Sequence, residues 1–273
     1  MESVHHSVWK AAGVYDAIKG LVYNVHTDKH LIFGLAERWC CDTSTFVFPW
    51  GEATVTLEDI MILGGFSVLG GPVWFPLQSP ELVEIEQNLE KARIFAFPVE
   101  QYDKISTHVF RVASNLARGK RLALAPAVLS SIYRDLSLLR EAMTISTSSK
   151  NKDDRNRFQI LGFCLSSPLL FIQAWAWERL VVLRPKQAGN YNMVGGARIG
   201  RWHDVKRSGV INVRAAIDSS AETFQWRPYA LSVEGSSVPK FYKETEEWEI
   251  VENFGPRIRV LYSMLAGVGS CWF

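Results

Sequence analysis

The sequence predicts a mainly α protein: a single multi-helical domain with one small β-hairpin near residues 45–56. Three observations support this prediction. Apolar residues recur at helical spacing along most of the chain. Short β-prone runs flank turn residues at one place, and no glycine-rich nucleotide-binding turn follows a strand. Hydrophobic residues make up 48% of the 273 residues and include ten tryptophans, which is enough for a large buried core.

The first elements are expected to be two helices. Apolar spacing predicts one over Val8–Tyr23 and the next over Lys29–Cys40. Asp28 precedes the second helix, where its side chain can accept a hydrogen bond from a first-turn amide.

The hairpin and a capped helix follow directly. The β-prone runs Phe46–Phe48 and Ala53–Val55 flank the turn residues Pro49–Glu52. Thr56 can then cap the amide of Asp59, and Gly64–Gly65 ends the helix because glycine adopts the left-handed conformation at low cost.

Four more helices are predicted by proline starts and apolar stripes: 80–95, 100–117, one from 125 to either 139 or 143, and 168–180. The last is apolar nearly all round, so we expect it to be buried. The polar stretch 144–156 is expected to form a loop between two halves of a domain that spans residues 1–229. Residues 230–273 form a C-terminal extension.

Charge is uneven along the chain although the net charge is only +2. The basic side chains of segment 184–214 are interleaved with Tyr191 and Trp202, a mixture suited to phosphate contacts and base stacking. A candidate nucleic-acid interface therefore comprises Arg184, Lys186, Arg198, Arg201, Lys206 and Arg207. A charged surface without a ligand remains the alternative. An acidic segment with five glutamates follows at 244–252.

No pattern in the sequence predicts a reaction. There is no GxSxG elbow, no phosphate-binding loop, no HExxH pair and no cysteine spacing typical of zinc. We therefore expect no catalytic residue, no metal and no cofactor. The four cysteines form no disulfide framework, which favours a reducing intracellular compartment. The longest apolar runs fall short of the ~20 residues that cross a bilayer, so no membrane association is expected.

A set of short motifs resembles the plant mobile domain family, also described as aminotransferase-like or maintenance-of-meristems-like. The motifs occur in the family's order between about Leu21 and Tyr229, and together they are specific. They are Glu37–Trp39, Thr45–Asp59, Leu116–Gly119, Leu124–Leu129, Ile132–Leu136, Trp175–Arg179, Arg201–His203 and Trp226–Tyr229.

The resemblance implies a mostly helical, non-enzymatic interaction domain shared between host proteins and transposable elements. It implies a place in the nucleus, in meristem maintenance, transposon silencing or gene-expression control, with protein partners that include phosphatase-like proteins. It supplies no catalytic residues, and the aminotransferase-like label finds no support in this sequence. A transposon-derived nucleic-acid-binding domain is the alternative.

One departure from the family stands out. Members carry a further helical segment after the helix that begins near Ser79, whereas here Lys91–Phe95 passes almost directly into Ala96–Tyr102. The sequence thus predicts an internal deletion near residue 95. Since removing a core helix would expose its apolar partners, a degenerate, non-functional copy is a further alternative.

Overall fold

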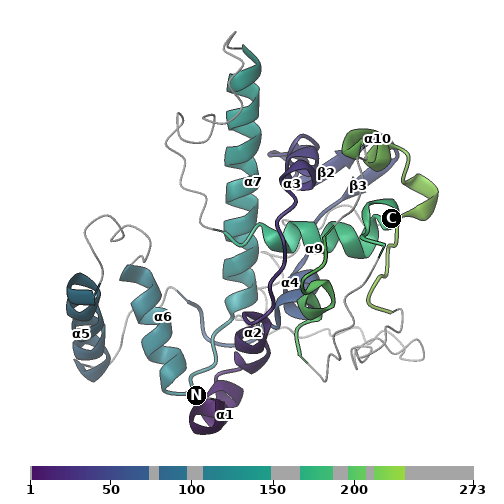
Figure 1. The fold of residues 1–273 in the computed structure, drawn as a ribbon. Helices are drawn as coiled ribbons and strands as arrows, with labels where there is room; N and C mark the ends of the chain where they lie inside the picture. The colour runs from purple at the N-terminus through teal and green to yellow at the C-terminus, as the bar shows by residue number, and fades with distance from the viewer. Residues whose placement is uncertain are drawn as a thin grey trace, which may run out of the picture.

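The computed structural model describes residues 2–73, 80–96, 107–148, 167–186, 196–206 and 212–230. Most of these residues are helical, which confirms the mainly α prediction (Figure 1). The α-helices are α1 (Glu2–Ala11), α2 (Tyr15–Gly20), α3 (Lys29–Ala36), α4 (Leu57–Gly64), α5 (Pro80–Ala96), α6 (Thr107–Ala117), α7 (Leu124–Ser148), α9 (Leu170–Arg179) and α10 (Val213–Asp218). Short 3-10 turns are η2 (Val181–Leu183), η3 (Arg198–Trp202) and η4 (Ala221–Thr223).

The long helix α7 divides the structure. In Figure 1, α3, α9, α10 and the small sheet lie to one side of α7, while α5 and α6 lie to the other. Helix α7 contacts α3 and α4, and α6 contacts α1 and α5. No described helix is both long enough and apolar enough to cross a membrane.

The sheet contains the predicted hairpin and one strand more. β1 (Trp39–Cys40), β2 (Thr45–Phe48) and β3 (Gly51–Ala53) are antiparallel in that order. The helix predicted to reach Cys40 ends at Ala36, so its last turn was wrong. Pairing of Trp39 with Phe46 explains the difference, because it brings their rings to 5.1 Å and lets the Trp39 indole donate to Ser137 Oγ on α7 (3.0 Å).

Two other helix boundaries differ from the predictions. Gly13, with φ +69°, separates α1 from α2 inside the predicted Val8–Tyr23 helix. A side chain there would also collide with Arg121, whose Nε lies 2.6 Å from an ideal Cβ position. Helix α7 continues to Ser148, so the first five residues of the predicted polar loop are helical. The rest of that loop lies outside the described residues.

The two predicted helix caps, Asp28 and Thr56, are confirmed. Asp28 Oδ1 accepts a hydrogen bond from the Leu31 amide (3.1 Å), and Thr56 accepts one from the Asp59 amide (3.4 Å). The α4 stop is confirmed too, since Gly65 has φ +69°.

Helix α9 forms the centre of the core, as its apolar pattern predicts. Every residue from Phe171 to Arg179 is buried, including three polar ones. Gln173 illustrates how these are satisfied: its amide donates to the His26 carbonyl (2.8 Å) and accepts from the Asp28 amide (2.6 Å). The buried amide thereby holds the start of α3 against α9.

Tyr133 joins α7 to the end of the hairpin. Its hydroxyl donates to the Val55 carbonyl (2.6 Å) and lies 3.1 Å from Thr54 Oγ1. Burial raises the pKa of Tyr133 to about 12.

This pKa predicts a loss of stability in alkali. An unfolded tyrosine ionises near pH 10, so between about pH 10 and 12 the unfolded state binds fewer protons than the folded state, and stability falls as pH rises. Between about pH 9 and 11.5, urea unfolding should show the wild type losing roughly 2 kcal/mol more than Tyr133→Phe. Equal losses would contradict a buried, protonated Tyr133.

Candidate functional site

Asp59 is the centre of a buried polar network at the start of α4. It is the third residue of the helix and is completely buried. Its Oδ2 accepts from the Thr56 amide (2.7 Å) and from the Thr56 hydroxyl (2.8 Å), which completes a capping box. The carboxylate also lies at the positive end of the helix dipole, a favourable position for an acidic side chain.

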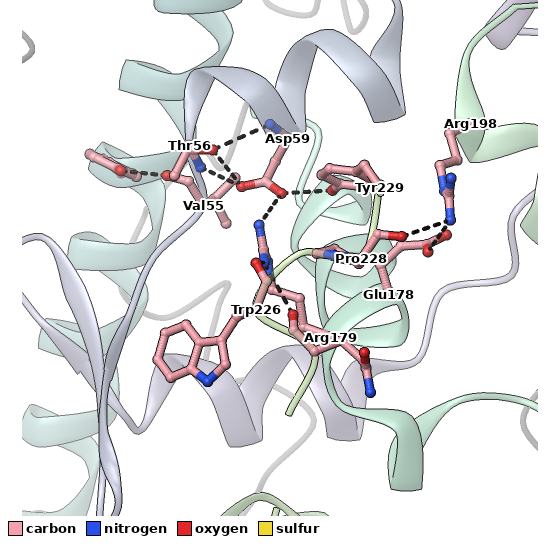
Figure 2. A network of polar contacts seen from close by, with 11 residues as sticks. Val55, Thr56, Asp59, Glu178, Arg179, Arg198, Trp226, Pro228 and Tyr229 are labelled. Carbon is pink, nitrogen blue, oxygen red and sulfur yellow. Dashed lines mark hydrogen bonds and ion pairs between the residues drawn. The ribbon is translucent and has the colours of Figure 1, made fainter. Parts of the chain in front are cut away.

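The other oxygen of Asp59 binds two residues that are remote in the sequence. Oδ1 accepts from Arg179 Nη2 at the end of α9 (2.8 Å) and from the Tyr229 hydroxyl (2.6 Å), as Figure 2 shows. Arg179 Nη1 in turn donates to the carbonyls of Gln225 (3.3 Å) and Trp226 (2.8 Å). One carboxylate thus fixes α4, α9 and the segment 225–229 relative to each other.

Tyr229 and Arg179 both keep their protons in this network. Burial, and then the charge of Asp59, raise the pKa of the Tyr229 hydroxyl well above its ordinary value, so it remains a donor. Burial acts to lower the pKa of Arg179, but the interactions with Asp59, Tyr229 and Glu58 together outweigh burial and raise that pKa. Both side chains therefore remain hydrogen-bond donors to Asp59.

A second charged centre lies at the buried Glu178, which directly precedes Arg179 on α9. Its Oε2 accepts from Arg198 Nη2 (3.1 Å) and from Arg201 Nη1 (2.9 Å), both on η3. Arg184 donates to the backbone carbonyls of Trp177 (2.8 Å) and Glu178 (3.0 Å). We refer to Arg184, Arg198 and Arg201 as the arginine cluster.

The structure separates the six predicted nucleic-acid-binding residues into two groups. Arg198 is buried, Arg201 has a side chain only 15% exposed, and Arg184 is half-buried, all within the arginine cluster. Lys186 and Lys206 are exposed, and Arg207 lies outside the described residues. Nucleic-acid binding stays a prediction, but the residues able to reach a phosphate backbone are the lysines rather than Arg198.

One large side chain beside the network faces solvent. Trp226 is 58% exposed, unlike the buried Trp175, Trp177 and Tyr229. Its ring lies 4.7 Å from that of Phe224 and 6.4 Å from that of Trp50, both edge-on. Figure 2 shows the indole directed away from the polar contacts. Packing and the Arg179 hydrogen bond thus hold an aromatic ring at the surface.

Two hollows lie on the surface of the described residues. The larger, about 580 Å³, is lined by α1, α2 and the residues that follow α4. The smaller, about 360 Å³, is lined by both Cys40 and Cys41 together with Arg38 and Arg140. The hydroxyl of Thr43 lowers the pKa of the Cys40 thiol by hydrogen bonding.

Sequence reasoning missed the pairing partners in this site. It identified Asp59 only as part of a helix start, and it assigned Arg198 and Arg201 to a ligand. The available signal was the dipeptide Glu178–Arg179 in a helix that is otherwise apolar nearly all round, because buried charges of this kind need partners.

The Asp59–Arg179 pair yields a stability prediction. Asp59→Asn or Arg179→Gln leaves a buried charge without its partner, so each should cost about 3–5 kcal/mol in urea unfolding. The double variant should cost clearly less than the sum, because the two changes remove the same interaction.

Arg214→Gln is the matched control. It breaks the ion pair with Glu37, in which the Arg214 side chain is 67% exposed. That change should cost less than about 1 kcal/mol. Additive losses in the Asp59 and Arg179 double variant would show that the pair is not coupled.

Comparison with known proteins gives the relationship of the chain. The plant mobile domain family model matches residues 13–96 and 93–261, in two segments that meet where the sequence predicts an internal deletion. Protein MAINTENANCE OF MERISTEMS of Arabidopsis thaliana is 22% identical over 82% of this chain and 52% of its own length. Serine/threonine-protein phosphatase 7 long form homolog, from the same plant, is 28% identical over 63% of this chain and 15% of its own length.

A shorter match, Protein MAIN-LIKE 2 of Arabidopsis thaliana, is 51% identical over 18% of this chain and 7% of that protein. The chain thus spans about half the length of the first of these relatives and a small part of the others. No solved structure matches. The family model covers most of the sequence, so the chain belongs to the plant mobile domain family.

Proposed function

We propose that this chain is a non-enzymatic protein-interaction domain that acts in the nucleus, in meristem maintenance, transposon silencing or gene-expression control. The name of the relative MAINTENANCE OF MERISTEMS supports the developmental part of this proposal. The carboxylates of Asp59 and Glu178 are both engaged by arginines inside the fold. Their use as structural anchors supports a binding role over a catalytic one.

The exposed Trp226 is the observation that carries the proposal. Tryptophan and arginine dominate binding energy at protein interfaces, and rigid aromatic rings lose little conformational entropy on binding. Trp226 is held by Phe224, Trp50 and Arg179, and the exposed Arg227 follows it. The buried network thus holds the Trp226 ring at the surface, where a partner can contact it together with the neighbouring Arg227.

A phosphatase-like protein is the partner class we propose. One relative bears a phosphatase name, and the matched region takes up 15% of it. A domain of this kind therefore occurs within a longer chain of that name.

The experiment measures binding of a purified phosphatase-like protein by calorimetry. Trp226→Ala should weaken binding at least tenfold, a loss of about 1.4 kcal/mol or more, because it removes a central aromatic contact. The thermal midpoint should stay nearly unchanged, since the ring is exposed. Leu21→Ala is the control. Leu21 is 80% exposed and lies far from Trp226 in the sequence, so this variant should bind as the wild type does.

Equal binding by the Trp226→Ala variant would contradict the proposed surface. A fluorescently tagged full chain that is excluded from plant nuclei would contradict the proposed location.

Nucleic-acid binding remains the second candidate, favoured by the exposed Lys186 and Lys206 beside the arginine cluster. Gel-shift titration at several salt concentrations should then show affinity that falls as salt rises, because phosphate contacts release counterions. Lys186→Gln with Lys206→Gln should reduce the salt slope by about 2. Lys10→Gln with Lys91→Gln changes two exposed lysines elsewhere and should leave the slope unchanged. Affinity that does not respond to salt would rule this candidate out.

A further inference from the structure

Two free thiols lie next to each other at the end of β1. Cys40 is the last residue of this strand, pairs with Thr45 on β2 and is half-buried. Cys41 begins the loop between the two strands and is exposed. Both side chains are therefore accessible from solvent.

Hydrogen bonds fix the loop that follows Cys40. The Ser44 amide donates to the Cys40 carbonyl (3.0 Å), and the Ser44 carbonyl accepts from the Thr54 hydroxyl (2.8 Å). The hydroxyl of Thr43, and then the amides of Thr43 and Asp42, lower the pKa of the Cys40 thiol by hydrogen bonding, against the opposing effects of burial and of the Asp42 charge. Because the thiolate is the nucleophile in disulfide exchange, these donors favour reaction at Cys40.

The two cysteines line a surface hollow that also contains charged side chains. Its volume of about 360 Å³ lies within the range of sites that take small molecules, roughly 300–1,000 Å³. The charged residues of the lining are Glu37, Arg38 and Arg140. A molecule that reacts with a thiol here therefore meets two guanidinium groups and one carboxylate.

The three charged side chains of the lining are not equally occupied. Glu37 forms its ion pair with Arg214, and Arg38 binds both carboxylate oxygens of Asp218 (2.5 and 2.6 Å). Within the described ranges of the chain, no ion pair engages Arg140. Arg140 is thus the cation of the lining that can bind an anionic group of an incoming molecule.

We propose that Cys40 is a site of reversible thiol modification, at which its thiolate exchanges with a small disulfide that carries carboxylates. Oxidised glutathione, a tripeptide disulfide, represents this class. The Cys40 sulfur attacks one sulfur of the S–S bond and forms a mixed disulfide, while the other tripeptide leaves as a thiolate that takes a proton from water. Cys40 is oxidised and the leaving half is reduced, so no other oxidant is needed. Arg140 binds a carboxylate of the tripeptide that stays attached.

The position of this modification determines what it covers. Trp39 donates to Ser137 on α7, and Arg38 binds Asp218 on α10, so the hollow lies beside the contacts of this segment with both helices. A tripeptide attached to Cys40 covers these contacts and adds negative charge to the surface. A reducing thiol removes it by the reverse exchange.

The experiment follows the reaction of the full chain with oxidised glutathione, and mass spectrometry maps the mixed disulfides so that products at Cys164 and Cys271 are counted separately. Cys40→Ser should lower the rate of modification at residues 40–41 by about fivefold or more, because it removes the thiol whose thiolate is stabilised. Cys41→Ser is the matched control and should react at nearly the wild-type rate.

A second comparison tests the role of charge. Arg140→Gln should slow the reaction with oxidised glutathione about threefold, the effect of losing one partly exposed ionic contact, and high salt should remove this difference. The same variant should react at the wild-type rate with bis(2-hydroxyethyl) disulfide, which has no carboxylate. Lys120→Gln removes an exposed positive charge from the segment before α7 and should change neither rate.

Three results would overturn the proposal. They are a lack of mixed disulfide at Cys40 in the wild type, equal rates for Cys40→Ser and Cys41→Ser, and an Arg140→Gln variant that reacts with both disulfides as the wild type does. Equal slowing with the charged and the neutral disulfide would also contradict it, because the arginine would then not act on a carboxylate. The reaction needs no protein partner, so its failure leaves the proposed role of Trp226 untouched.

Discussion

The ion pair between Asp59 and Arg179 is the interaction on which the rest of the structure depends. Burying two charges is costly unless each is paired and its remaining hydrogen bonds are satisfied. Here the carboxylate receives four donors and the guanidinium reaches two backbone carbonyls. That geometry can be met only when α4, α9 and segment 225–229 all occupy their positions. The pair therefore acts less as a source of stability than as a condition for one specific arrangement.

The charged centres at Asp59 and Glu178 account for several of the short, dispersed motifs by which the family is recognised. Thr56–Asp59 supplies the cap and the acid, Trp175–Arg179 the two charged anchors, Arg201–His203 part of the cation cluster, and Trp226–Tyr229 the closing hydroxyl. Polar geometry tolerates fewer substitutions than apolar packing, which needs only suitable size and shape. By contrast, α5 and α6 contact each other and α1, away from this network. The two segments of the family match meet at the end of α5, away from the charged centre.

Local patterns were sufficient for much of the fold. Apolar spacing, capping residues and glycine stops predicted α4, the hairpin, α9 and most of α7, because each depends on neighbours in the sequence. They failed at Trp39, where pairing with Phe46 outweighed helical spacing, and at Gly13, whose positive φ separates α1 from α2. The site was not predictable in the same way. In the sequence, Arg198 and Arg201 look like surface cations. In the structure they are directed inward because both form ion pairs with the buried Glu178, which is distant in the sequence.

The separation of the Asp59 partners along the chain has a consequence for synthesis. Arg179 and Tyr229 lie 120 and 170 residues after Asp59. A nascent chain that has emerged only through α7 holds the acid at the start of α4 without its cation or its tyrosine hydroxyl. Since a buried carboxylate without these donors is strongly unfavourable, α4 cannot settle into the core at that stage. The charged centre can thus be completed only after Tyr229 has left the ribosome.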